Sequence, residues 1–156
     1  MGSISDEEKI RPCAEVLDKL GISYLFTVSS AHRTPRRTEC LIDSLEKDGC
    51  KVFICAAGVA AHLAGAVAAR TIKPVIGIPV TASALGGLDA LLSTVMMPPG
   101  FPVGTVALDE PGARNAAWYA AQILALDDAG LAERLLQARA EFVAGVEKAA
   151  ARLEGK

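Results

Sequence analysis

The run Lys51-Val52-Phe53-Ile54-Cys55-Ala56-Ala57 is apolar at every position after the lysine. A strand with one face in water would carry a polar residue at every second position, and this run does not. A second unbroken run, Pro74-Val75-Ile76-Gly77-Ile78-Pro79-Val80, follows it. Unbroken apolar strands are typical of parallel sheets that helices cover on both faces. The two runs therefore predict buried strands of a parallel sheet.

Outward from these runs, the chain alternates between strand-like and helix-like patterns. We expect further strands over 23–29 and 103–107. Apolar residues recur at helical spacing between the strands, as at Leu41, Ile42 and Leu45. The alternation predicts an α/β fold: one domain, residues 1–156, built as a three-layer α/β/α sandwich with a parallel sheet, flavodoxin-like or Rossmann-like.

Capping residues, prolines and glycines predict where the helices begin and end. Ser5 and Glu8 have the spacing of a capping box at the start of the first helix. Pro35 suits the first position of the second helix, with Thr34 as the cap before it. The remaining helices are expected over 62–70, 88–94, 113–126 and 129–154.

The final helix, 129–154, is amphipathic. One face carries the apolar residues Leu131, Leu135, Phe142, Val146 and Leu153. A helix of this kind at a chain end often packs on another subunit, and we expect it to do so here. Packing on its own domain is the alternative.

The N-terminal stretch Gly2-Ser3-Ile4-Ser5-Asp6 has the pattern of a loop that enters a helix. Such a loop normally follows a strand, and the printed sequence has no strand before it. We expect either that the first strand lies upstream of Met1 or that the sheet is built without it.

Composition excludes several classes of function. The net charge of the 156 residues is −2, so no basic surface field points to nucleic acid. The chain is 51% hydrophobic, yet it has no apolar run long enough to cross a membrane and no signal peptide. The four cysteines lack zinc-site spacing, and Cys13 and Cys55 lie in apolar patterns typical of buried free thiols. These features predict a cytoplasmic protein.

The stretch Ser29-Ser30-Ala31-His32-Arg33-Thr34-Pro35 carries the chemistry that we consider most informative. It lies between an expected strand and an expected helix, where open α/β sheets bind their ligands. Arg33 and the helix start suit an anion, and His32 is able to exchange a proton near neutral pH. The alternative is a surface turn with a solvated arginine.

Three further stretches are candidates for the same site. Small residues over 58–65 let a flat ligand approach the backbone, and His62 follows them; the alternative is a hydrogen-bonded histidine at a helix start. Ser3 and Ser5 suit an anion at the helix start, and Asp6 suits sugar hydroxyls; the alternative is a simple capped helix. The proline-rich segment 96–102 is expected to form a rigid pocket wall or a connector.

Together these stretches resemble the PurE family of purine biosynthesis, the N5-carboxyaminoimidazole ribonucleotide mutases. Gly2-Ser3-Ile4-Ser5-Asp6 is similar to the family's Gly-Ser-x-Ser-Asp loop, and Ser30-Ala31-His32-Arg33-Thr34-Pro35 matches its most specific turn. The stretch Gly58–Gly65 resembles its Gly-Gly-Ala-Ala-His-Leu-Pro-Gly loop. The block 85–124 resembles the last third of the family sequence. The chain departs from the pattern at Ala56, Val59 and Ala64.

The resemblance implies a metal-free, cofactor-free carboxyl shift on a ribonucleotide, in a homo-octamer whose interfaces help to build the sites. His32 is expected to act as general acid and base, with His62 as a second catalytic residue. Arg33 and Ser5 are expected to bind the phosphate, and Ser3 and Asp6 the ribose. The other expected substrate contacts are Ser30, Ala31, Ala57, Gly58, Ala61 and Leu63.

Other functions remain open at this stage. A sister activity carboxylates aminoimidazole ribonucleotide directly with carbon dioxide. A homologue that kept the fold and lost the reaction would bind the nucleotide without turnover. A generic dinucleotide-binding domain is disfavoured, because the chain has no Gly-x-Gly-x-x-Gly turn.

Overall fold

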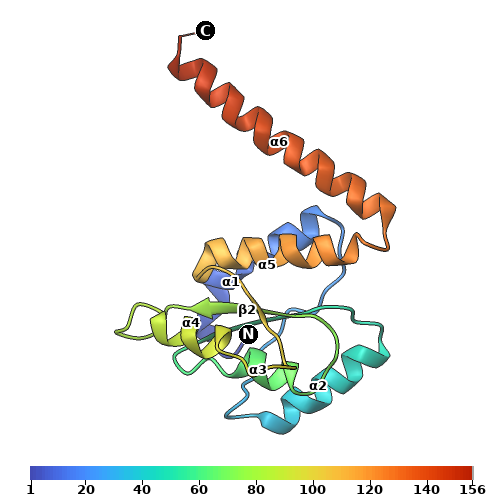
Figure 1. Cartoon of the computed structure of the whole chain (residues 1–156), viewed down its shortest axis with the longest axis vertical. Coiled ribbons are helices and arrows are strands. Elements are labelled where there is room, and N and C mark those ends of the chain that lie inside the picture. The colour runs from blue at the N-terminus through green and yellow to red at the C-terminus, as the bar shows by residue number, and fades with distance from the viewer. Residues whose placement is uncertain (156) are drawn as a thin grey trace.

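The structure is a computed structural model, and it describes residues 1–155. Ten elements follow one another along the described chain (Figure 1). They are the short 3-10 helix η1 (Ile4–Asp6), α1 (Glu7–Lys19), α2 (Pro35–Lys47), β1 (Phe53–Gly58), α3 (Leu63–Ala68), β2 (Val75–Val80), α4 (Leu88–Val95), β3 (Gly104–Thr105), α5 (Asp109–Leu124) and α6 (Ala129–Leu153).

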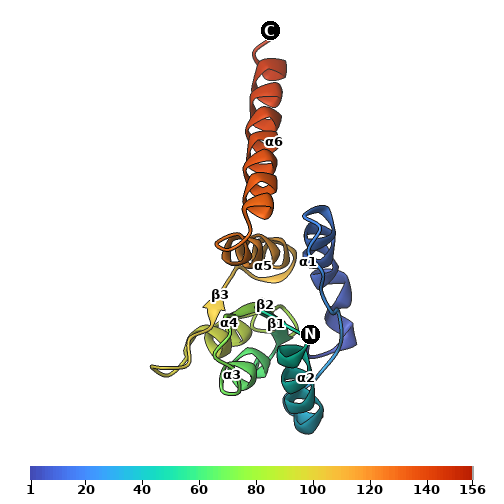
Figure 2. The same ribbon diagram turned by 90° about the vertical axis from the view of Figure 1, so that its right-hand side faces the viewer.

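The sheet confirms the predicted α/β sandwich. Its three strands are parallel and lie in the order β1-β2-β3, with Phe53 opposite Val75 and Gly58 opposite Val80. Every residue of β2 is buried, as an unbroken apolar strand requires. Helices α1 and α5 lie on one side of the sheet, and α2 and α3 lie on the other (Figure 2).

The expected strand over 23–29 is wrong. This segment is not a strand of the sheet: among residues 1–155, Met1 is the one residue outside the segment and its flanking turns that forms backbone hydrogen bonds with it. The Met1 amine donates to the Thr27 carbonyl at 3.0 Å, and the Ser29 N–H donates to the Met1 carbonyl at 2.9 Å. A segment without a longer partner cannot form a ladder. The strand expected over 103–107 is also shorter than predicted, since only Gly104 and Thr105 pair with β2.

Two capping predictions are corrected by the structure. Ser5 does not cap α1, because it lies inside η1, where the Ser3 hydroxyl accepts its N–H at 3.4 Å. Pro35 is the first residue of α2, as predicted, but Thr34 makes no side-chain cap. The Thr34 hydroxyl instead accepts the Ser30 N–H at 3.0 Å, so it closes the preceding turn.

Two apolar clusters form the core, one on each face of the sheet. On one face, the small alanines of α5 permit close contacts with α1 and with β2. On the other, Ile42, Leu63 and Val67 pack on Phe53. Each fully buried side chain of this size contributes about 1.5–3 kcal/mol. Cys13 and Cys55 are buried free thiols, as predicted, and burial raises their pKa to about 11 and about 12.

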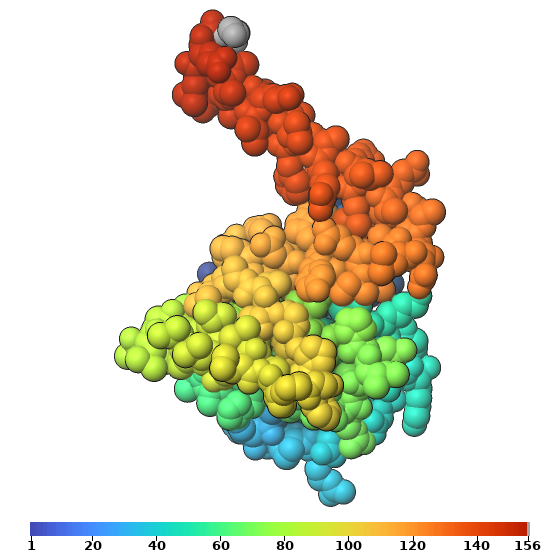
Figure 3. All heavy atoms as spheres, in the orientation of Figure 1, coloured from blue at the N-terminus to red at the C-terminus, as the bar shows by residue number. Residues whose placement is uncertain are grey.

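Helix α6 projects from the rest of the molecule (Figures 1 and 3). Asp128 caps its start by accepting the Leu131 N–H at 2.9 Å. Only the first half of α6 has buried residues, Leu131 and Ala138. Among the described residues, no helix is long and apolar enough to cross a membrane.

Candidate active site

Three loops meet at the end of the sheet toward which β1 runs. They are residues 2–6, the turn 30–34, and the segment 59–62 that follows β1. The Gly2 N–H donates to the Ala56 carbonyl at 2.8 Å, and an Arg33 guanidinium nitrogen donates to the Gly2 carbonyl at 3.3 Å. These bonds connect the first loop to β1, which leads into the segment 59–62, and to the turn 30–34. Ligands of parallel sheets bind outside the carboxyl ends of the strands, and the loops lie there.

The two histidines of the chain lie in direct contact between two of these loops. His32 Nε2 is 2.8 Å from His62 Nδ1, and the rings are T-shaped with centroids 4.9 Å apart. One of these nitrogens therefore carries the shared proton and the other accepts it. Both side chains are exposed, so a ligand is able to reach them. The pair is a proton acceptor and donor at the meeting point of the loops.

Local hydrogen bonds hold the His32 turn in shape. The Ser30 hydroxyl accepts the Arg33 N–H at 3.2 Å, and Thr34 bonds to both backbone groups of Ser30. Below the turn, the buried hydroxyls of Ser29 and Thr38 lie 2.8 Å apart. Ala31 is half-buried beside this turn and packs against the core. The backbone around His32 and Arg33 is therefore fixed.

The loop at residues 2–6 places two hydroxyls and a carboxylate together. The Ser5 hydroxyl is 2.9 Å from Ser3 Oγ and 3.2 Å from Asp6 Oδ1. Ser5 is exposed and Ser3 is half-buried, whereas Asp6 is only 5% exposed. Asp6 lies just before the start of α1, where the helix dipole favours its negative charge. The hydroxyls are accessible to a ligand, and the carboxylate holds the loop.

The loop after β1 is shaped by close backbone contacts. A Cβ on Gly58 would lie 2.7 Å from the Ala82 Cβ and 2.9 Å from the Val80 carbonyl oxygen, so only glycine fits. Ala57 is half-buried, and Ala61 and Leu63 are buried, so a ligand would meet mainly their backbone. The N–H groups of Val59, Ala60 and Ala61 have no acceptor among the described residues. They are available as donors.

A pocket of about 450 Å³ lies beside His62. Sequence analysis identified His62 and the pocket wall at 96–102, and Met96 and Met97 do contribute to that wall. It missed the contribution of α4, because the residues there are an ordinary apolar pattern with one serine. The lining residues are His62, Gly65, Ala66, Leu92, Ser93, Met96 and Met97.

No metal centre accompanies these residues. Within residues 1–155, no three His, Cys, Asp or Glu side chains are grouped so that they would hold a metal ion.

Val59 has a strained backbone in this loop. Its φ is 56°, a left-handed conformation that a β-branched residue rarely adopts. We expect Val59→Gly to raise the free energy of unfolding by about 1 kcal/mol. The substitution removes about 1–2 kcal/mol of left-handed backbone strain. Glycine also gives the unfolded chain more conformational entropy, which offsets part of this gain. Val59 is 52% exposed, so little packing is lost.

Urea unfolding measures this effect. Val59→Ala is the matched control, because it keeps the Cβ and therefore most of the strain. A Val59→Gly protein that unfolds more easily than the unmodified protein would contradict the strain argument.

Known proteins resemble this chain over most of its length. Residues 1–144 match the family described as AIR carboxylase. Proteins named N5-carboxyaminoimidazole ribonucleotide mutase are 51% identical in Brucella melitensis biotype 1 (86% of this chain, 83% of the relative), 48% in Escherichia coli K12 (86% and 80%) and 44% in Pyrococcus horikoshii (99% and 86%).

A solved structure shares the fold. The crystal structure of Treponema denticola PurE superposes with a TM-score of 0.89 at 27% identity and covers 98% of this chain and 94% of its own. The match to the family extends over most of the chain and includes all three loops of the site. The chain therefore belongs to the AIR carboxylase family, as the PurE resemblance of its loops predicts.

Proposed function

We propose that this protein acts in purine biosynthesis and converts N5-carboxyaminoimidazole ribonucleotide to 4-carboxy-5-aminoimidazole ribonucleotide. The observation that carries the proposal is the contact between His32 Nε2 and His62 Nδ1, at 2.8 Å, where the three loops meet. The relatives named above add the substrate, since several of them carry the name of this mutase. Because these relatives carry the name of the mutase, we favour the mutase over direct carboxylation.

The carboxyl shift requires two proton transfers at neighbouring atoms of the substrate. The N–C bond to the carboxyl group breaks and releases carbon dioxide, and the exocyclic nitrogen gains a proton. Ring carbon 4 then forms a new bond to the carbon dioxide and loses its hydrogen as a proton. His32 gives the first proton and takes the second, so the enzyme returns to its starting state. His62, in contact with His32, positions its ring and shares its proton.

Carbon dioxide has to stay in the site between the two steps. The free N–H groups of Val59, Ala60 and Ala61 lie next to His62 in the chain and donate to carboxylate or carbon dioxide oxygens in this proposal. Gly58 allows the close approach. A small pocket that excludes water would prevent the loss of the intermediate to solution.

The rest of the nucleotide is assigned to the other two loops. Arg33 has guanidinium donors beyond the one bonded to Gly2, and it binds the phosphate together with Ser5. Ser3 and Asp6 bind the ribose hydroxyls. Backbone groups of Ser30, Ala31, Ala57 and Leu63 complete the substrate contacts, and neither metal nor organic cofactor takes part.

We also propose a homo-octamer in the cytoplasm. The exposed apolar side chains on the outer part of α6 need a partner, and an additional copy of the chain offers the same apolar face. Those side chains are Val143, Val146 and Leu153, whereas Phe142 beside them packs edge-on against Trp118 of α5, with ring centroids 5.6 Å apart. All four cysteines are free thiols, which fits the reducing cytoplasm.

His32→Asn tests the proton transfer. We expect turnover to fall by at least about 100-fold, because asparagine neither donates nor takes a proton in the reaction. Ultraviolet absorbance of the 4-carboxylated product measures turnover, and calorimetry with the product measures binding, which should stay nearly unchanged. Retained turnover would exclude His32 as the acid and base.

Arg33→Ala tests the phosphate contact. We expect KM to rise by at least about tenfold, since a charge-assisted bond to the phosphate is lost, while kcat changes less. Arg36→Ala is the matched control, because Arg36 is also an exposed arginine and lies in the first turn of α2, close to Arg33 in the chain. Equal KM values for Arg33→Ala and the unmodified protein would contradict this role.

Val143→Glu combined with Val146→Glu tests the assembly, because both side chains are exposed. Charged residues on the apolar face of α6 are expected to shift the protein to smaller assemblies, because buried unpaired charges are costly. Light scattering measures the mass in solution. The control is Lys148→Glu, which changes an exposed polar position of α6. An unchanged mass for the double variant would show that this face is not an interface.

A further inference from the structure

A lysine, a threonine and an aspartate from three different parts of the chain meet at the end of the sheet toward which β2 runs. Thr81 directly follows β2, Lys9 lies in the first turn of α1, and Asp109 begins α5. The Lys9 ammonium donates to the Thr81 carbonyl and to the Thr81 hydroxyl, each at 2.5 Å. The Thr81 N–H donates to Asp109 Oδ1 at 2.9 Å, and the Thr81 hydroxyl donates to Asp109 Oδ2. We refer to these three residues as the Lys9 clamp.

The charges of the clamp hold its geometry. The Lys9 ammonium also lies 3.3 Å from Asp109 Oδ1, so oxygens of two residues surround it. Partial burial alone would raise the pKa of the Asp109 carboxyl, but the hydrogen bonds from Thr81 and Lys9 lower this pKa, so the group is ionised at neutral pH. An exposed ion pair by itself contributes little, whereas several charge-assisted bonds to one residue restrict the position of that residue. The clamp therefore fixes Thr81.

The backbone of Asp109 is strained. Its φ is 54°, in the left-handed region that favours glycine. Strain of this kind persists where the surrounding contacts impose it. At this position, the contacts are the two bonds that the Asp109 carboxylate accepts from Thr81. The side chain of Asp109 thus offsets a backbone conformation that glycine would adopt more easily.

Thr81 connects the clamp to the loop after β1. A Cβ on Gly58 would lie 2.7 Å from the Ala82 Cβ and 2.9 Å from the Val80 carbonyl oxygen, so the residues on both sides of Thr81 lie against Gly58. Gly58 leads directly into residues 59–61, whose N–H groups lack an acceptor within residues 1–155. The position of Thr81 therefore helps to determine where these N–H groups lie.

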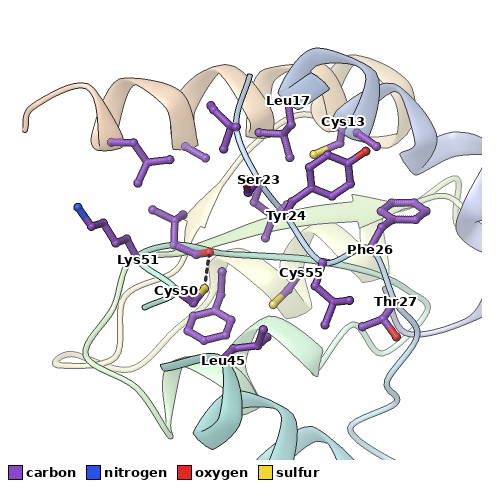
Figure 4. A pocket seen from close by; sticks show the side chains of 18 of the residues that line it. Cys13, Leu17, Ser23, Tyr24, Phe26, Thr27, Leu45, Cys50, Lys51 and Cys55 are labelled. Carbon is purple, nitrogen blue, oxygen red and sulfur yellow. Dashed lines mark hydrogen bonds between the residues drawn. The ribbon is translucent and has the colours of Figure 1, made fainter. Parts of the chain in front are cut away.

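The end of β1 is supported mainly from the side of β2. Gly58 of β1 lies opposite Val80 of β2. Along the other edge of β1 lies a cavity of about 660 Å³, whose far wall includes the segment 22–27 (Figure 4). Because the interior is open on that side, the contact of Gly58 with residues 80–82 carries more of the support for the loop that follows.

We propose that the Lys9 clamp positions the N–H groups of residues 59–61 for the retention of carbon dioxide, a role that rests on the proposed carboxyl shift. Lys9, Thr81 and Asp109 are positioning residues, because they act through Gly58. In the intact protein, the loop holds carbon dioxide until ring carbon 4 forms a bond to it. When the clamp is broken, the loop moves and more carbon dioxide leaves the site first. The exocyclic nitrogen then keeps the proton that it gained, aminoimidazole ribonucleotide is released, and His32 regains a proton from water.

Two variants break the clamp. Lys9→Met removes the ammonium and keeps most of the length of the side chain, and Asp109→Gly removes the carboxylate and suits the left-handed backbone. Asp109→Asn is the conservative variant, because asparagine tolerates this backbone and keeps an acceptor for the Thr81 N–H. Arg114→Met is the matched control. Arg114 of α5 also pairs with α1, at 3.8 Å from Glu15, and has no bond to the clamp.

Methyl NMR of Ala60, Ala61 and Ala82 tests the positioning itself. An alanine methyl carbon is bonded to Cα, so its order parameter reports the mobility of the backbone. We expect the order parameters to fall in Lys9→Met and Asp109→Gly and to stay unchanged in Asp109→Asn and Arg114→Met. This measurement needs no turnover. If the unmodified protein forms no 4-carboxylated product, the proposed function fails by itself, and the methyl mobility alone decides whether the clamp positions the loop.

The second measurement is the amount of aminoimidazole ribonucleotide released per 4-carboxylated product, corrected for the reaction without protein. We expect this ratio to rise by at least about threefold in Lys9→Met and Asp109→Gly, because carbon dioxide escapes from a looser loop. KM is expected to change by less than about twofold, since the phosphate contacts remain. Asp109→Asn should restore most of the original ratio, and Arg114→Met should not change it.

Unchanged methyl mobility in both clamp variants, or an equal change in Arg114→Met, overturns the proposal. A lower thermal midpoint with an unchanged release ratio in an active protein would show a merely structural role, and this result also overturns it. If either clamp variant does not fold, Thr81→Val is measured in the same way. Valine keeps the size of the side chain and the N–H bond to Asp109 but loses the hydroxyl that bonds to Lys9 and Asp109.

Discussion

The arrangement of the site depends on three backbone hydrogen bonds made by Met1 and Gly2. They connect the segment before the His32 turn to β1, whose end leads to His62. Because these bonds hold the two sides at strand spacing, the two imidazoles come within 2.8 Å of each other. The Gly2–Asp6 loop follows directly, and its Gly2 carbonyl accepts a hydrogen bond from Arg33. Few bonds therefore determine where three loops meet.

The chemistry of the site follows from this geometry. Two exposed histidines in contact provide a group that gives and takes a proton, and free N–H groups after Gly58 provide donors for carboxylate or carbon dioxide oxygens. Val59, whose backbone is strained, provides one of these N–H groups. Strain of this kind persists only where the surrounding structure imposes it, and here the close approach of Gly58 to Val80 and Ala82 does so.

The sequence predicted the buried strands well, because β1 and β2 are unbroken apolar runs that only a covered parallel sheet accommodates. It also identified the residues of the histidine contact through their turns. It failed over 23–29, since a strand depends on its neighbours and local pattern does not show whether a neighbour is present. The prediction that Thr34 caps α2 was wrong for a related reason. The Thr34 hydroxyl could accept an N–H of α2 or an N–H of the preceding turn, and it accepts the Ser30 N–H of the turn. The α4 residues that line the pocket beside His62 lie in an ordinary apolar pattern, so the sequence did not predict their place in the site.

The most direct test of the proposed reaction is isotopic. Substrate labelled with carbon-13 in its N5-carboxyl group is converted in the presence of unlabelled bicarbonate, and the product is examined by carbon-13 NMR. A carboxyl shift within a closed pocket predicts that most of the label appears in the 4-carboxyl group of the product. A product that takes its carboxyl carbon from the unlabelled bicarbonate would contradict the shift and identify direct carboxylation instead.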